Sequence, residues 1–241
     1  MHIDIWSDYV CPFCYIGKRR LELALEQFTY KQQVTISYKS YELDPNAPAE
    51  STMGIHAMLA AKYGMTIDEA KKANANVAAQ AESVGLTFRF DNMVPTNTFD
   101  AHRLAKFAKK HEKENAMIEI LFKAYFTDSE RLANHNTLAK LAGQAGLNCK
   151  EVFEILEDPK AFADEVRSDE EMAKQMGIRG VPFFVFNQKY AVSGAQPMET
   201  FVSVLQKVWA SEKQTPVLRH LTDDGAGCVD DSCEIPVNKN G

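Results

Sequence analysis

The sequence lacks the features that mark several classes of protein. It has no excess of basic residues, because 27 Lys and Arg stand against 33 Asp and Glu for a net charge of −6, so nucleic acid is not an expected partner. Residues 1–6 carry neither a basic region nor an apolar run of signal-peptide length, and no later run is long enough to span a membrane. These absences predict a cytoplasmic protein that binds neither nucleic acid nor membrane.

Cysteine is also scarce, and its spacing is informative. The five cysteines fall as a C-x-x-C at Cys11 and Cys14, a C-x-x-x-x-C at Cys228 and Cys233, and the single Cys149. The reducing thiol pools of the cytosol argue against structural disulfides. Closely spaced cysteines in such a chain therefore indicate redox chemistry or a metal site.

Apolar periodicity separates two short α/β parts from a long helical block. Residues 1–43 predict a strand, a helix and a second strand. Residues 183–209 predict a β-hairpin that turns at Asn187 and Gln188, followed by a helix. Between the two parts the periodic segments are helical, namely 57–63, 68–84, 98–111, 116–126, 136–145, 150–157 and 159–176.

Capping residues support these helices. Asp68 and Asn136 are the expected N-caps of two of them. Gly146 and Gly177 stand where helices commonly stop.

The order of elements is β-α-β, a helical block, then β-β-α. This order predicts an α/β, thioredoxin-like fold with a large all-helical insertion. The expected division places the thioredoxin-like domain in residues 1–45 and 178–214 and the inserted helical domain in residues 46–177. Residues 215–241, which contain the second cysteine pair, have little to bury and are expected to form an extended C-terminal tail.

The first cysteine pair opens a predicted helix directly after a strand. Cys14 follows Cys11 by three residues, a spacing of about 5–6 Å on a helix, which a disulfide tolerates. Pro12 suits the first helical turn, so Cys11 is the expected N-cap, where the helix terminus favours a thiolate. Cys11 is then the nucleophile and Cys14 the resolving thiol. Asp8 would oppose the thiolate if its carboxylate came close.

A zinc site is the alternative, with Cys228 and Cys233 as its second half. Zinc knuckles favour turns, whereas Cys11 and Cys14 open a helix, which favours redox chemistry. Pro182 stands at the start of the predicted third strand. Its presence there has a simple structural explanation, because the first residue of a strand does not need an N–H for hydrogen bonding within the sheet.

Three segments together resemble the DsbA-like FrnE family over nearly the whole chain. They are SDYVCPFCYIG at residues 7–17, TFDAHRL at 98–104 and GIRGVPFF at 177–184. The resemblance implies a thioredoxin fold with a helical insertion and dithiol–disulfide oxidoreductase activity, with disulfide isomerase activity in some members. The related families are DsbA, 2-hydroxychromene-2-carboxylate isomerase and kappa-class glutathione transferase.

The resemblance also assigns roles to residues. Cys11 is the attacking thiol, Cys14 the resolving thiol, and Pro182 a cis-proline facing them, while the backbone of Val181 pairs with a bound peptide. The expected substrate-binding residues are Val181, Pro12, Phe13 and His102, although helical histidines more often serve packing. DsbA has a histidine between its cysteines that this chain lacks, so its redox potential does not transfer.

The implied partners are protein thiols and disulfides, with glutathione as a further candidate. No cofactor beyond the redox-active disulfide and no metal is implied.

The remaining cysteines have two interpretations. Some FrnE-like proteins carry a C-terminal pair, so Cys228 and Cys233 are hypothesised to exchange with the first pair, the alternative being a passive tail. Their acidic neighbours should raise the thiol pKa values. Cys149 precedes an apolar helix and is interpreted as its entry residue.

Two other functions compete with the oxidoreductase. One is a glutathione-dependent small-molecule isomerase or transferase, but in those relatives a serine commonly stands at the position of Cys11. The other is a holdase-type binding module that uses an apolar groove of the insertion. The sequence leaves open the substrate, the direction of electron flow and the oligomeric state.

Overall fold

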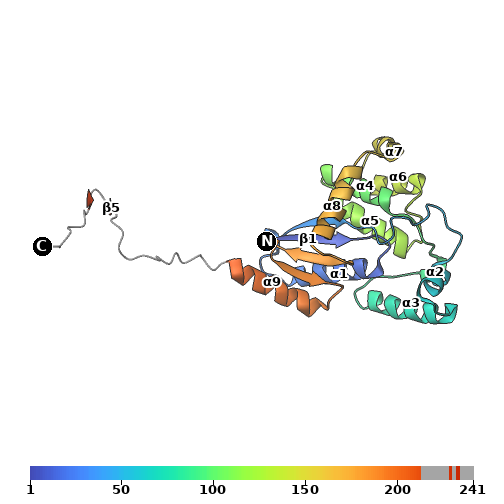
Figure 1. The fold of residues 1–241 in the computed structure, drawn as a ribbon, viewed down its shortest axis with the longest axis horizontal. Coiled ribbons are helices and arrows are strands. Elements are labelled where there is room, and N and C mark those ends of the chain that lie inside the picture. Colours follow the sequence, from blue (N-terminus) through green and yellow to red (C-terminus); the bar gives the residue numbers. More distant parts are fainter. Residues whose placement is uncertain (213–227, 230–231, 234–241) are drawn as a thin grey trace.

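A four-stranded mixed sheet forms the centre of the molecule (Figure 1). The structure is a computed structural model that describes residues 1–212 and the backbone of residues 228–229 and 232–233. The strand order is β2-β1-β3-β4, with β1 (His2–Ser7), β2 (Thr35–Ser40), β3 (Phe183–Phe186) and β4 (Tyr190–Ser193). β1 runs parallel to β2 and antiparallel to β3. The register pairs Trp6 with Phe183, so the loop after β1 and the loop before β3 meet at one edge of the sheet.

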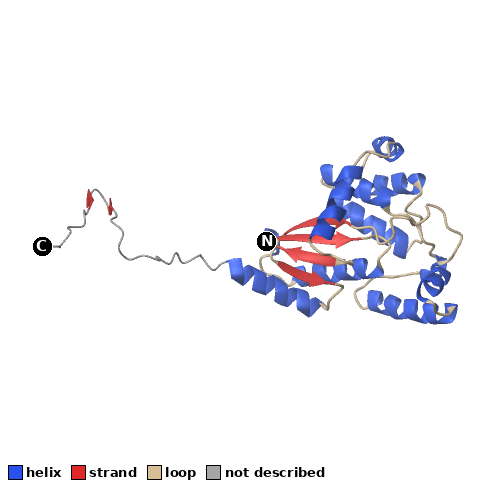
Figure 2. Ribbon diagram, viewed as in Figure 1, coloured by secondary structure: helices blue, strands red, loops and turns tan. Residues whose placement is uncertain are grey.

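Helices lie around the strands (Figure 2), and they follow the predicted order along the chain. After β1 comes α1 (Pro12–Glu26), and α9 (Met198–Glu212) follows β4. Between β2 and β3 lie α2 (Ile55–Tyr63), α3 (Ile67–Glu82), α4 (Phe99–Lys110), α5 (Glu114–Phe126), α6 (His135–Gln144), α7 (Cys149–Glu157) and α8 (Ala163–Gln175). The predicted thioredoxin-like topology with a helical insertion is confirmed.

The alternation of side chains along the strands explains how the two faces of the sheet are covered. Phe184 packs edge-on against Phe201 of α9, with ring centroids 4.9 Å apart. Trp6 points to the opposite face, where its indole N–H donates to the carbonyl of Asp169 in α8 over 3.0 Å. α8 therefore covers one face of the sheet and α9 the other.

The sheet and the helical block share a hydrophobic core. The ring of Tyr15 in α1 stacks on Phe122 of α5 at 4.9 Å, and Phe88 stacks on Phe126 at 4.4 Å. The division of the chain into two domains stays a prediction.

Two predicted N-caps are wrong by two residues. Thr66, rather than Asp68, caps α3, where it forms a reciprocal capping box with Glu69. Asn134, rather than Asn136, caps α6 by accepting from the N–H of Thr137 over 3.0 Å. In both places a short polar residue nearer the true start reaches the free N–H groups.

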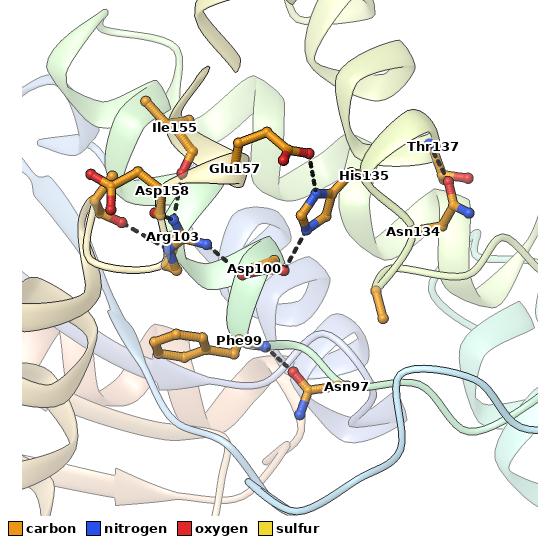
Figure 3. Close-up of polar contacts among 12 residues, drawn as sticks. Asn97, Phe99, Asp100, Arg103, Asn134, His135, Thr137, Ile155, Glu157 and Asp158 are labelled. Atoms are coloured by element: carbon orange, nitrogen blue, oxygen red, sulfur yellow. Dashed lines mark hydrogen bonds and ion pairs between the residues drawn. The ribbon is translucent and has the colours of Figure 1, made fainter. Parts of the chain in front are cut away.

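The predicted helix 159–176 also begins too early, because α8 starts at Ala163. Phe162 before it has a positive φ of 60°. The buried guanidinium of Arg103 in α4 binds the carbonyls of Ile155, Asp158 and Ala161 (Figure 3). Those carbonyls are turned towards Arg103, so this stretch forms a turn and not a helix.

Other local predictions are confirmed. Asn187 and Gln188 have φ values of 49° and 56°, as a tight hairpin turn requires. Gly146 and Gly177 end their helices with φ values of 78° and 71°. Within residues 1–212, no helix combines the length and the apolar character that crossing a membrane requires.

Candidate active site

The C-x-x-C segment lies at the edge of the sheet where β1 passes into α1. Cys11 is the N-cap of α1, with an extended backbone and no hydrogen bond from its side chain to the helix, and Pro12 occupies the first turn. The N–H of Cys11 donates to the carbonyl of Asp8 over 3.1 Å, and the N–H of Cys14 donates to the carbonyl of Cys11 over 3.0 Å. The tight turn thus places both thiols on the first turn of the helix, as predicted.

The two thiols are free, and Cys11 lies close enough to Cys14 to affect its ionisation. Their exposed fractions are 5% for Cys11 and 2% for Cys14. Burial raises the pKa of Cys14 well above its ordinary value, and the neighbouring Cys11 raises it further. The backbone of Asp8 and the side chain of Ser7 favour the Cys14 thiolate and act in the opposite direction on its pKa. Cys14 is therefore held as a thiol, which is the form a resolving cysteine has at rest.

The loop before β3 faces Cys11. The Cys11 thiol donates to the carbonyl of Val181 over 3.6 Å. The Val181–Pro182 peptide bond is cis, as the resemblance implied. Phe13, between the cysteines, is 40% exposed, and Pro12 and Val181 are partly exposed. The structure therefore brings together Cys11, Cys14 and these neighbours at one edge.

His102 lies elsewhere. It is 2% exposed, on α4, with its ring 4.7 Å from that of Tyr9. Its Nε2 lies 3.4 Å from Oδ1 of Asp8. The structure places His102 in the interior, against Asp8 and Tyr9 of the loop that leads to Cys11.

Two buried carboxylates, Asp8 and Glu42, lie near this edge, and the sequence alone predicted no catalytic or binding role for either. Asp8 is fully buried, and its Oδ2 accepts from the N–H of Leu43 over 2.7 Å. Glu42 is also buried, and the guanidinium of Arg167 donates to its Oε2 over 2.5 Å. Burial raises the pKa of Glu42, and Arg167 opposes that rise. Asp8 lies three residues before Cys11 and was expected only to oppose the thiolate, whereas nothing in the local sequence marks Glu42.

A cleft of about 550 Å³ opens beside the loop that leads to Val181. It is lined by Tyr41, Glu42, Pro45, Glu170, Lys174 and residues 177–179.

Cys149 is the first residue of α7, which agrees with its interpretation as an entry residue. It is free and exposed, and its thiol donates to the carbonyl of Ala139 over 3.5 Å. The backbones of β5 (Cys228–Val229) and β6 (Ser232–Cys233) pair antiparallel with Cys228 opposite Cys233, but the side chains of this pair lie outside the described residues.

The described residues contain no group of three or more His, Cys, Asp or Glu side chains arranged to hold a metal ion. The four-thiolate zinc site depends on Cys228 and Cys233 and stays a hypothesis, as does the exchange between the two cysteine pairs.

Comparison with known proteins agrees with the observed fold. Residues 2–206 match the family model described as the DSBA-like thioredoxin domain. The chain is 40% identical to a probable DsbA oxidoreductase from Streptomyces coelicolor, whose crystal structure superposes with a TM-score of 0.85 over 98% of this chain and 99% of that chain.

Two further relatives are more distant. The uncharacterized protein YwbO from Bacillus subtilis is 26% identical over 205 residues, which cover 83% of this chain and 94% of YwbO. A 2-hydroxychromene-2-carboxylate isomerase shares the fold with a TM-score of 0.67 at 14% identity, over 88% of this chain and 98% of the isomerase.

Proposed function

Because the chain belongs to the DSBA-like thioredoxin domain family, we propose that it is a dithiol–disulfide oxidoreductase that acts on protein thiols through Cys11 and Cys14. The observation that carries the proposal is the placement of two free thiols at the start of α1, with Cys11 facing the carbonyl of Val181. A pair in this position can form and break a disulfide with little movement of the backbone.

The reaction uses the two sulfurs in sequence. The Cys11 thiolate attacks a substrate disulfide, which forms a mixed disulfide and releases one substrate thiol. Cys14 then loses its proton and attacks the sulfur of Cys11, which closes the Cys11–Cys14 disulfide and releases the second substrate thiol. Two electrons pass from the dithiol to the substrate. The reverse sequence oxidises a substrate dithiol, and isomerisation results when the substrate itself resolves the mixed disulfide.

Apolar exposure near the thiols supports a polypeptide substrate. Phe13 is 40% and Leu43 is 44% exposed, and Leu43 is held at this edge by its hydrogen bond to Asp8. Peptide recognition would add strand-like hydrogen bonds to the backbone of Val181. We propose a cytoplasmic setting, in which glutathione is a candidate small-thiol partner.

Insulin reduction and the refolding of scrambled ribonuclease test this function. We expect Cys11→Ser to abolish both activities. Cys14→Ser should accumulate a mixed disulfide with the substrate, visible as an adduct by mass spectrometry, because the resolving thiol is missing. Cys149→Ser is the matched control, since Cys149 is free and exposed on α7, and it should retain full activity.

Two results would contradict the proposal. Full activity of Cys11→Ser would remove the proposed nucleophile. Tight binding of glutathione by a protein whose Cys11 and Cys14 do not titrate as a dithiol would favour the glutathione-dependent isomerase or transferase instead.

A further inference from the structure

Two buried polar atoms behind the cysteine pair face each other without a hydrogen bond. His102 Nε2 and Asp8 Oδ1 lie 3.4 Å apart, and the side chains are 3% and 1% exposed. Neither atom has a hydrogen-bond partner within the part of the chain that the structure describes. Since buried polar groups are nearly always satisfied, such a pair calls for an explanation. A proton arriving on the imidazole would supply one, because the carboxylate attracts an imidazolium.

Both members of the pair are held in place. Asp8 is anchored by the Leu43 N–H on its Oδ2, and its backbone carbonyl accepts from the N–H of Cys11 over 3.1 Å. The ring of His102 packs against Tyr9. The imidazole therefore stays close to the segment that carries Cys14, although 88 residues separate His102 from Cys14 in the sequence.

A small cavity connects the two. It has a volume of about 10 Å³, about the size of one water, and both Ser7 and His102 line it. The side chain of Ser7 also lies close enough to Cys14 to favour its thiolate. Polar groups thus lead from Cys14 past Ser7 and the cavity to His102.

We propose that His102, positioned by Asp8, accepts the proton of the Cys14 thiol through the Ser7 hydroxyl and one water in this cavity. The proposal rests on the function proposed above. As the proton moves to His102, the Cys14 thiolate attacks Cys11 in the mixed disulfide, the Cys11–Cys14 bond forms, and the substrate leaves with the electron pair of the broken bond. When the Cys11–Cys14 disulfide is reduced, Cys14 leaves as a thiolate and recovers the proton from His102.

Charged groups of both signs lie around His102 and its cavity. The cations Lys39 and Lys106 lie at the same cavity, but both form ion pairs with Asp169 of α8. Two carboxylates, Asp8 and Glu42, interact favourably with His102. The titratable groups around His102 or its cavity are Asp8 and Tyr9 before α1, Tyr38 and Lys39 in β2, Glu42 after β2, Lys106 in α4 and Glu114 in α5.

The resolving step can be measured on its own with Ellman's reagent. The parent is the full chain carrying Cys149→Ser, Cys228→Ser and Cys233→Ser, so that only Cys11 and Cys14 react. Stopped flow should show two releases of thionitrobenzoate, the first when Cys11 attacks the reagent and the second when Cys14 resolves the mixed disulfide. The Cys14→Ser variant of this parent should release one equivalent.

We expect His102→Gln to slow the second release about a hundredfold near neutral pH and to leave the first unchanged. In this variant the rate of the second release should rise with pH, because the Cys14 thiol must lose its proton without His102 to accept it. Ser7→Ala should shift the pH profile in the same direction, and it decides the question if His102→Gln fails to fold. His111→Gln, an exposed histidine at the end of α4, is the matched control and should leave both releases unchanged.

The outcomes separate this inference from the proposed function. If folded His102→Gln and Ser7→Ala keep the parent's second release and its pH profile, the proton path is wrong while the dithiol function stands. If the parent shows no rapid first release, or Cys14→Ser still gives two equivalents, the proposed function fails as well. A purely structural role of His102 would change stability without displacing the pH profile.

Discussion

Gly17 in α1 packs directly against Pro182. A methyl group at Gly17 would lie 3.1 Å from Cγ of Pro182 and 3.2 Å from Cζ of Phe184. Both distances are shorter than the ordinary separation of about 3.5–4.0 Å between carbon atoms in contact. The absence of a side chain at Gly17 therefore sets how closely the helix carrying Cys14 approaches the loop carrying Val181.

Gly17→Ala should accordingly lower both stability and activity. The added methyl meets two rings with little freedom to move, so we expect a loss of about 1–3 kcal/mol in the free energy of unfolding. Insulin reduction should fall because α1 is pushed away from Val181. Urea unfolding and the activity assay check the two effects. Gly180→Ala is the control, because a methyl there meets nothing within 4 Å, and equal losses in both variants would contradict the packing argument.

The hairpin between β3 and β4 offers a stabilising change. Gln188 has a positive φ of 56°, a conformation that costs an ordinary residue about 1–2 kcal/mol and glycine almost nothing. Gln188→Gly should therefore raise the free energy of unfolding by about 0.5–1 kcal/mol, since asparagine followed by glycine is the preferred pair for this turn. Thermal and urea unfolding measure the gain. Gln188→Ala should give none, and a loss with Gly would mean that the turn is not strained.

The sequence predicts the parts of this molecule that depend on local rules. Three features depend only on residues that are neighbours in the sequence. They are the helix start at the C-x-x-C, the turn at Asn187 and Gln188, and the glycines that end α6 and α8. The cap at Thr66 is of the same kind, because Thr66 and Glu69 form a recognisable capping box that the choice of Asp68 overlooked.

What the sequence could not predict depends on contacts between distant residues. Pro159 favours a helix start, but Arg103 binds the Ala161 carbonyl from 58 residues away and holds a turn there instead. Asp8 and His102 belong to separate motifs, and their contact follows only from the position of α4 against the loop after β1. The sequence shows which residues are aromatic or polar, but it does not show which of them lie close together in the fold.

Arg103 is expected to be a major source of stability for the helical insertion. Its side chain is 2% exposed and forms an ion pair with Asp100 at 2.6 Å, and Asp100 in turn binds His135 at 2.8 Å (Figure 3). The single ammonium group of lysine cannot reproduce the several N–H donors of the planar guanidinium. Arg103→Lys should therefore leave buried carbonyls without a hydrogen bond and lower the free energy of unfolding by about 3–5 kcal/mol. Urea unfolding measures this cost. Arg131→Lys, at an exposed position, should be neutral, and a similar stability of both variants would refute the role of Arg103.

Cys14 and Cys149 should differ strongly in reactivity, because both are free but only Cys149 is exposed. Burial, the largest cause, raises the pKa of Cys14 well above the ordinary 9.0, and it persists when Cys11 is removed. In Cys11→Ser we therefore expect iodoacetamide to modify Cys14 at least about tenfold more slowly than Cys149 near neutral pH.

Raising the pH should speed the modification of Cys14, since a group with a raised pKa releases its proton only in more alkaline solution. Peptide mapping by mass spectrometry follows each cysteine separately. In urea the difference should vanish, because an unfolded Cys14 is no longer shielded from water. Equal rates in the native protein would show that the Cys14 thiol ionises as easily as an exposed one, and a proton acceptor for it would then be unnecessary.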